Sequence, residues 1–199
     1  MYGYAQMTFI HALMGQGKTT DCLSFYKRLT INGKDVWLIK PAVDNRDGDK
    51  ITSRIGLSER AQAVVSKDDN IVALYNELEF ATPSRIPEII IVDEAQFLTR
   101  EHVNQLRMLN ITRNIPIYCY GLLTDASTNL FEGSERLIAI SDVVKEIEAV
   151  CTCGGRAIVN ARINKDGRVV MPTQVIDIGY EDKYKPMCAS CFIKNGGKF

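Results

Sequence analysis

Four short apolar runs recur along the first 120 residues, and each contains β-branched side chains. They cover residues 7–10, 35–40, 88–93 and 116–120. Runs of this length without alternating polar positions are typical of strands buried on both faces of a parallel sheet. Between them, apolar side chains recur every three or four positions in residues 19–29 and 103–109, which is the period of an amphipathic helix. The pattern therefore predicts an α/β fold, an open parallel sheet with helices on both faces.

One long stretch of the first 150 residues lacks any hydrophobic period. Residues 41–56 are rich in Asp, Arg and Gly. Loops of this length are usually functional, so we expect a mobile loop that contributes to a binding site.

The pattern changes near residue 150. Residues 144–150 alternate as a strand and lead into Cys-Thr-Cys-Gly-Gly. Two shorter strand-like segments follow at 157–163 and 168–170, joined by the hairpin turn Asn-Lys-Asp-Gly. We therefore expect two domains, an α/β domain over residues 1–150 and a small C-terminal domain over residues 151–199.

A phosphate-binding loop directly follows the first predicted strand. Residues 12–19 read Ala-Leu-Met-Gly-Gln-Gly-Lys-Thr, which is the Walker A pattern except that Ala12 stands at the first glycine. In such a loop, backbone N–H groups surround phosphates, Lys18 supplies a positive charge and the Thr19 hydroxyl binds Mg²⁺. An accidental Gly-Lys-Thr at a helix start is the alternative, which the strand before and the helix after disfavour. The motif predicts a RecA-like P-loop domain.

A pair of carboxylates follows the third predicted strand. Asp93 and Glu94 come directly after four apolar residues, at the carboxyl end of a strand, where open α/β sheets bind ligands. Asp93 fits a Walker B carboxylate that holds Mg²⁺, and Glu94 fits a general base beside the transferred phosphoryl group. An acidic pair alone could cap a helix, but with the phosphate-binding loop it predicts a nucleotide site.

Four of the six cysteines form two close pairs on turn-like segments. Their spacing matches tetrahedral thiolate coordination of a structural Zn²⁺, and four thiolates leave no open position for water. Reduced core thiols are the alternative. The predicted zinc ligands are Cys151, Cys153, Cys188 and Cys191.

The remaining cysteines and both histidines have simpler explanations. Cys22 lies on a predicted helix and Cys119 in an apolar strand, so we expect both in the core. His11 and His102 have no partner at a ligand spacing, and we interpret both as structural.

Composition narrows the class of protein. The 199 residues are 46% hydrophobic, and 24 basic residues balance 24 acidic ones. A neutral chain lacks the positive charge of a dedicated nucleic-acid-binding domain. No apolar run approaches the roughly 20 residues that cross a bilayer, and the N-terminus lacks signal-peptide features. We expect a cytoplasmic protein with no nucleic-acid or membrane partner.

At Asp-Glu-Ala-Gln-Phe, residues 93–97, the sequence resembles the type II thymidine kinases, a P-loop and zinc-containing family, and it is similar to a bacterial- or phage-like member. The resemblance covers nearly the whole chain. It rests also on Lys-Pro-Ala-Val-Asp-Asn-Arg (40–46), Ser-Arg-Ile-Gly (53–56), Tyr-Gly-Leu (120–122), Thr-Asp (124–125), Leu-Phe-Glu-Gly-Ser (130–134) and Asp-Lys-Tyr (182–184).

The resemblance implies transfer of the γ-phosphate of ATP to the 5′-hydroxyl of thymidine and of deoxyuridine, with Mg²⁺, in deoxynucleotide salvage. It implies that Glu94 accepts the hydroxyl proton, that Phe97, Phe131 and Met14 surround the thymine, and that Tyr184 anchors a lasso loop reading the base. The implied lasso residues are Val175, Ile176, Asp177, Ile178 and Gly179. The implied ATP-binding residues are Ala12, Leu13, Met14, Gly15, Gln16, Gly17, Lys18, Thr19, Asp44, Asn45, Arg46, Asp93 and Gln96.

The resemblance also implies a homotetramer and feedback inhibition by thymidine triphosphate. The chain departs from the family pattern at three positions, which bear on substrate preference and efficiency: Leu123 replaces an Arg, Ala126 replaces a Phe, and Gln16 is larger than usual. A RecA-like ATPase whose zinc ribbon binds nucleic acid is the alternative function, and the balanced charge gives it less support. A catalytically weak regulator would lack Lys18 or Glu94.

Overall fold

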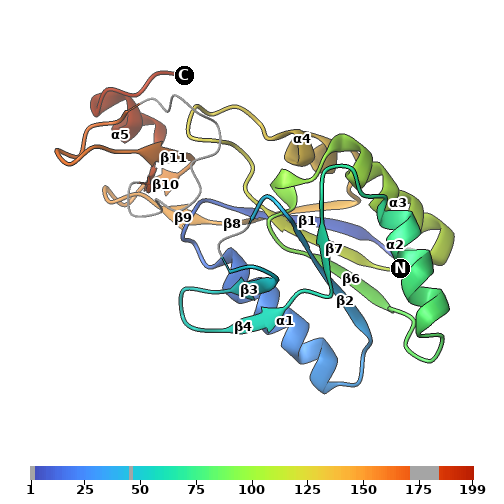
Figure 1. Ribbon diagram of the computed structural model, residues 1–199. Helices are drawn as coiled ribbons and strands as arrows, with labels where there is room; N and C mark the ends of the chain where they lie inside the picture. Colours follow the sequence, from blue (N-terminus) through green and yellow to red (C-terminus); the bar gives the residue numbers. More distant parts are fainter. Residues whose placement is uncertain (1–2, 45–46, 171–183) are drawn as a thin grey trace.

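The main body of the protein is a six-stranded sheet in which all neighbouring strands run parallel. The computed structural model describes residues 3–44, 47–170 and 184–199. The strand order is β5-β2-β6-β7-β1-β8, and Figure 1 labels each of these strands except β5. The strands are β1 (Met7–Ala12), β2 (Val36–Pro41), β5 (Ala63–Val65), β6 (Ile89–Val92), β7 (Ile117–Gly121) and β8 (Val143–Ile147). The predicted α/β fold is confirmed, and the four predicted strands correspond to β1, β2, β6 and β7.

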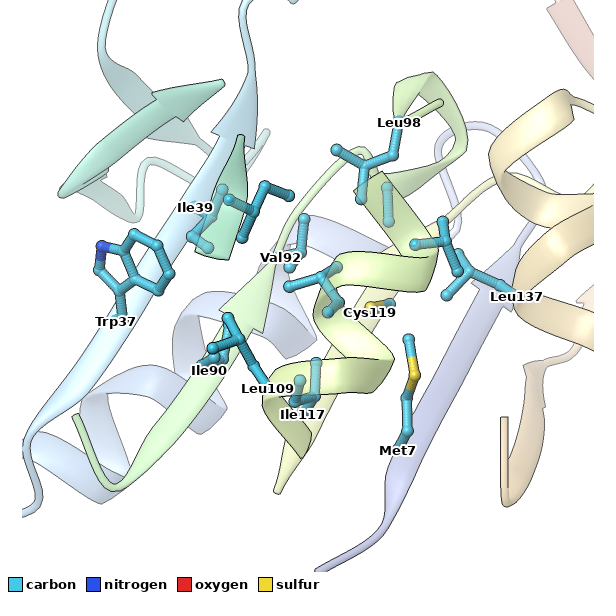
Figure 2. Packing of buried hydrophobic residues seen from close by; sticks show 14 of the residues in the cluster. Met7, Trp37, Ile39, Ile90, Val92, Leu98, Leu109, Ile117, Cys119 and Leu137 are labelled. Carbon is cyan, nitrogen blue, oxygen red and sulfur yellow. The ribbon is translucent and has the colours of Figure 1, made fainter. Parts of the chain in front are cut away.

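Helices cover both faces of this sheet. Helix α1 (Lys18–Ile31) lies on one face, and α2 (Ile71–Ala81), α3 (Arg100–Arg113) and α4 (Glu132–Ile140) lie on the other. Within β6, Ile90 and Val92 join the core cluster under α2, α3 and α4, whereas Ile91 joins the cluster under α1. Figure 2 shows side chains of the first cluster. This burial on both faces explains why the strand sequences lack alternation.

The segment predicted as a loop over residues 41–56 contains a strand, so that prediction is wrong in part. Strand β3 (Lys50–Thr52) pairs antiparallel with β4 (Ser58–Arg60). The buried Lys40 holds this hairpin against the sheet, because its Nζ donates to the Lys50 carbonyl at 3.0 Å and pairs with Asp44 at 3.2 Å. The two strand segments are short and mostly polar, so their sequences show no hydrophobic pattern that would predict a strand.

The predicted strand over residues 144–150 is divided between two sheets. Strand β8 pairs with β1, whereas β9 (Ala149–Val150) pairs with β10 (Arg156–Ala157) in a separate small sheet. The chain thus leaves the main sheet at Glu148. The division into domains at residue 150 stays a prediction.

The C-terminal segment has its own small core. Strand β11 (Val159–Arg162) pairs with β12 (Tyr184–Met187), and the short helix α5 (Ala189–Lys194) follows. Val159, Met187 and Phe192 are buried together there. The turn at residues 164–167 is confirmed, since the Gly167 N–H donates to the Asn164 carbonyl at 3.0 Å. The segment predicted as a strand over 168–170 pairs back across this turn through a bridge between Ile163 and Val169 and backbone hydrogen bonds of Asn164 with Arg168 and of Val170 with Arg162, although it forms no longer strand within the described residues.

Among the described residues, no helix combines the length and apolar character that a bilayer crossing requires.

Candidate active site

Most of the predicted phosphate- and substrate-site residues that the structure describes meet in one cavity at the carboxyl edge of the main sheet. Strands β1, β6 and β7 all end there, because parallel strands share one carboxyl edge. The cavity has a volume of about 580 Å³. Predicted site residues that line it are Leu13, Met14, Gly15, Gly17, Lys18, Thr19, Asp44, Asp93, Glu94, Gln96, Phe97, Phe131 and Tyr184.

Some predicted site residues do not line this cavity. Ala12 is buried at the end of β1. Gln16 folds back on its own loop, where its Nε2 lies 3.4 Å from the Met14 carbonyl, so the larger side chain does not fill the cavity. Asn45, Arg46 and the lasso residues Val175, Ile176, Asp177, Ile178 and Gly179 lie outside the described residues.

The phosphate-binding loop has the backbone geometry of an anion site. Gly15 and Gly17 have φ values of 73° and 81°, in the left-handed region where glycine avoids a steric penalty. Gly17 also caps α1, so the helix N-terminus opens into the cavity. Among the described residues, no hydrogen bond occupies the backbone N–H groups of Gly15, Gly17, Lys18 and Thr19. These donors and the helix dipole favour a bound phosphate chain.

Lys18 lies between the two predicted carboxylates. Its Nζ is 3.0 Å from Asp93 Oδ1 and 3.0 Å from Glu94 Oε1, and all three side chains are largely buried. Burial lowers the pKa of Lys18, but the two carboxylates more than offset this effect and the net shift is upward. Burial raises the pKa of Asp93 despite the attraction of Lys18. The cavity therefore holds a charged ammonium beside two crowded carboxyl groups.

Glu94 is held in an unusual backbone conformation. Its φ is 52° and its ψ is 36°, a left-handed conformation that costs free energy in a residue other than glycine. Gln96 Nε2 donates to Glu94 Oε2, and Gln96 Oε1 accepts from the Leu122 N–H at 3.0 Å. A Cβ on Gly121 would lie 2.9 Å from Gln96 Oε1, so any larger residue there would force Gln96 to move. Gln96 and Gly121 together orient the Glu94 carboxylate.

An aromatic pair forms another wall of the cavity. The rings of Phe97 and Phe131 are T-shaped, with centroids 5.8 Å apart. The small Ala126 also lines the cavity, whereas Leu123 packs against the main core. A flat apolar ring of a ligand can pack against the two phenylalanines.

Among the cavity residues that were not predicted as site residues, Arg54 and Asn160 lie against the phosphate-binding loop. Arg54 lies over the phosphate-binding loop, with Nη1 3.1 Å from the position of a Cβ on Gly15. In the sequence, only the Ser-Arg-Ile-Gly motif of residues 53–56 pointed to Arg54. Asn160 reaches the loop from the C-terminal segment, where its Oδ1 accepts from the Met14 N–H at 2.7 Å. No local sequence pattern marks that contact.

The four predicted zinc ligands converge. The sulfur atoms of Cys151, Cys153, Cys188 and Cys191 all lie within 4.8 Å of one another. Tetrahedral zinc with bonds of ~2.3 Å needs sulfur separations of roughly 3.8 Å, so the cluster fits the metal after small adjustments. Backbone hydrogen bonds from Cys153 and Cys188 lower the pKa of Cys151 to about 6, which favours the thiolate that binds metal.

The other cysteines and the histidines occupy structural positions. Cys22 and Cys119 are fully buried in the two core clusters of the main sheet. The backbone N–H of His102 donates to Thr99 Oγ1 at 3.1 Å, and Thr99 thereby caps α3. The ring of His11 lies beside that of Phe9, with centroids 5.6 Å apart.

Comparison with known proteins agrees with this geometry. The family model described as thymidine kinase matches residues 5–192. The thymidine kinase of Enterobacteria phage T4 is 38% identical over 185 residues, which cover 92% of this chain and 93% of the phage protein. The thymidine kinase of Mannheimia succiniciproducens is 35% identical over 195 residues, which cover 98% of each chain. The sequence resemblance is thereby confirmed, and the chain belongs to the thymidine kinase family.

Proposed function

We propose that this chain transfers the γ-phosphate of ATP to the 5′-hydroxyl of thymidine, and also of deoxyuridine, and so acts in deoxynucleotide salvage. The contact of Lys18 with both Asp93 and Glu94 is the observation that carries the proposal. It joins a phosphate-binding loop and a candidate base in one cavity, beside an aromatic wall.

The phosphate end of the cavity is the loop with α1. The N–H groups of the loop and the ammonium of Lys18 bind the β- and γ-phosphates, and Arg54 lies close enough to add a second positive charge. The Thr19 hydroxyl and Asp93 would hold Mg²⁺, which supplies charge neutralisation to the phosphates. Asn45 and Arg46 also belong to the proposed ATP site, and they lie outside the described residues.

Glu94 is the proposed catalytic base. One carboxylate oxygen accepts from Gln96 and the other lies beside Lys18, so the group is held with a fixed orientation. A carboxylate held in this way takes the proton of the 5′-hydroxyl as the oxygen attacks the γ-phosphate. Catalysis then rests on positioning and charge neutralisation rather than on a covalent intermediate.

The nucleoside end of the cavity is proposed to lie at the aromatic wall. The thymine packs beside Phe97 and Phe131, and the main chain of residues 175–179 reads its hydrogen-bonding edge. Tyr184, at the start of β12, lines the cavity, and we propose that it anchors that loop. If the main chain of residues 175–179 pairs with a pyrimidine edge, a purine would leave those polar groups unpaired, so we expect pyrimidine selectivity.

The cysteine cluster is proposed to bind one structural Zn²⁺. Four thiolates complete a tetrahedral site, so the metal stabilises the small C-terminal segment and takes no part in the reaction. Residues 151–199 are then a domain whose own core is too small to fold without the metal.

We further propose a cytoplasmic homotetramer that thymidine triphosphate inhibits. The homotetramer and the inhibition come from the family resemblance alone, whereas the cytoplasmic location is the expectation from the sequence composition. The alternative function, a RecA-like ATPase that binds nucleic acid through its zinc segment, is not favoured by the comparisons, because the matched relatives are named as thymidine kinases over nearly the whole chain.

A direct test separates the two functions. ADP release is measured with Mg·ATP alone, with added thymidine, and with added single-stranded DNA. We expect turnover that depends on thymidine and does not respond to DNA. Turnover that requires DNA would contradict the proposed function.

A further inference from the structure

Asn160 connects the cysteine-bearing segment to the phosphate-binding loop. It lies on β11 and is 2% exposed. Its side-chain Oδ1 accepts a hydrogen bond of 2.7 Å from the backbone N–H of Met14, 146 positions earlier in the chain. Both residues line the cavity. One buried amide therefore joins the segment that carries the cysteines to the loop that carries Lys18.

The orientation of this amide points to a role beyond packing. Because Met14 donates to Oδ1, the Nδ2 group must point elsewhere, and among the described residues it is buried without a hydrogen-bond partner. Burying an unpaired donor is unfavourable, and most buried side-chain polar atoms are paired. An apolar residue of the same shape would avoid that penalty. The bond to Met14 is the contact that the polar side chain supplies.

The position of Met14 explains what this bond controls. The loop is fixed at its end by Gly17, which caps α1. At its beginning the Asn160 bond fixes Met14, while Gln16 makes only longer contacts of 3.3 and 3.4 Å within the loop. The open N–H donor of Gly15 lies between these two points, and those of Gly17, Lys18 and Thr19 follow directly at the start of α1. Holding both ends keeps the donors aimed at the phosphates and reduces the ordering needed on binding.

A short path joins this bond to the cysteine cluster. Asn160 is paired across the sheet with Pro186, and its neighbour Val159 is paired with Met187, which directly precedes Cys188. Metal bound by the cysteines would thus fix the strand pair from which Asn160 projects.

We propose that Asn160 is a positioning residue: it fixes the phosphate-binding loop at Met14 and so couples the zinc-binding segment to ATP affinity. This inference rests on the proposed function only in assuming that the loop binds the phosphates of ATP. It assigns Asn160 no contact with the reacting atoms.

The test compares zinc-loaded wild-type protein with Asn160→Leu, which keeps the size of the side chain and removes the acceptor, and with Asn160→Ala. The matched control is Asn164→Ala, in the exposed turn of the same segment, where the side chain accepts only from nearby backbone N–H groups. Mg·ATP affinity is measured by titration calorimetry, zinc by elemental analysis, and KM and kcat by steady-state kinetics.

We expect both Asn160 variants to bind Mg·ATP about tenfold more weakly, as loss of one ordering hydrogen bond predicts. KM for ATP should rise while kcat at saturating ATP changes little, and zinc content should equal that of Asn164→Ala. A purely structural role would not give this separation of KM from kcat.

Lys18→Ala distinguishes failure of this inference from failure of the proposed function. If Lys18→Ala loses ATP affinity and the Asn160 variants do not, the inference is wrong and the phosphate site stands. If Lys18→Ala also binds like wild type, the loop is not the phosphate site and both fail. Loss of zinc or of the folded state in both Asn160 variants would also overturn the inference, because Asn160 would then be structural.

Discussion

Lys18 Nζ and Glu94 Oε1 lie 3.0 Å apart, so the group assigned to the phosphates touches the group assigned to the nucleoside hydroxyl. The γ-phosphate and the 5′-oxygen must therefore meet within a few ångströms of this contact. Reactions of this type depend mainly on such alignment. The roles of the two residues can be separated by substitution.

Glu94→Gln should lower kcat by about 10²- to 10⁴-fold, because the amide keeps the shape of the side chain and cannot accept the hydroxyl proton. Mg·ATP affinity and the unfolding temperature should stay close to those of wild type. Steady-state kinetics and calorimetric titration check the two parts. Turnover near the wild-type rate would show that Glu94 is not the base.

Asp93→Asn should stabilise the protein at alkaline pH in the absence of nucleotide and Mg²⁺. Burial raises the folded-state pKa of Asp93, so the stability that its protonated form provides is lost as pH rises through that raised pKa. The gain from Asn should be larger at pH 8 than at about pH 4, close to the ordinary pKa of Asp. Denaturant unfolding at both pH values measures the difference.

Asp142→Asn is the control of opposite sign for that experiment. The Asp142 carboxylate accepts two hydrogen bonds from Arg107 and one from the Met7 N–H, and these hold its pKa below the ordinary value. Its contribution to stability is present above the ordinary pKa and is lost as pH falls through the lowered pKa. Asp142→Asn should therefore destabilise the protein at pH 8. Equal effects of either variant at both pH values would contradict the account.

Gly121→Ala should reduce kcat without unfolding the protein. The added methyl group would lie 2.9 Å from Gln96 Oε1 and 3.1 Å from the Gln96 backbone N, so Gln96 must move and release Glu94. We expect a loss of about tenfold or more, as small displacements of catalytic groups produce. Gly3→Ala is the control, since its Cβ would meet nothing within 4 Å. Equal kcat values for the two variants would exclude this role of Gly121.

Cys191→Ser should reduce zinc binding and raise the KM for thymidine more than the KM for ATP. The segment between the cysteine pairs carries the proposed lasso, and disorder should spread there before it reaches the main sheet. ATP affinity should fall only by the amount that follows from weakening the hydrogen bond between Asn160 and Met14. Elemental analysis and separate titrations of both substrates measure this. Wild-type zinc content, or an ATP loss larger than the thymidine loss, would contradict the proposed division of roles.

Strand position and the main site motifs could be predicted from the sequence because local chemistry determines them. The apolar residues of β6 are all buried, and Asp93 and Glu94 directly follow them in the sequence. The glycines of the phosphate-binding loop and the spacing of the four cysteines are both visible in the sequence itself. Each of these features is encoded within a few residues.

Features that depend on distant contacts could not be predicted. The β3–β4 hairpin is polar and is held by the buried Lys40 beneath it. Asn160 is an ordinary strand residue by sequence, and its contact with Met14 appears only after the C-terminal segment has folded against the loop. The break at Glu148 follows from pairing with different strands on its two sides, β8 with β1 and β9 with β10.

Transfer of the γ-phosphate of ATP to thymidine is tested most directly by following a labelled γ-phosphate to its product, with wild-type protein and with Glu94→Gln. The acceptors compared are thymidine, deoxyuridine, deoxycytidine, deoxyadenosine and deoxyguanosine. We expect labelled thymidine 5′-monophosphate as the main product, a smaller amount of product from deoxyuridine, little from the purine deoxynucleosides, and a strong reduction with Glu94→Gln. Label found only in inorganic phosphate, or equal phosphorylation of purine deoxynucleosides, would contradict the proposed function.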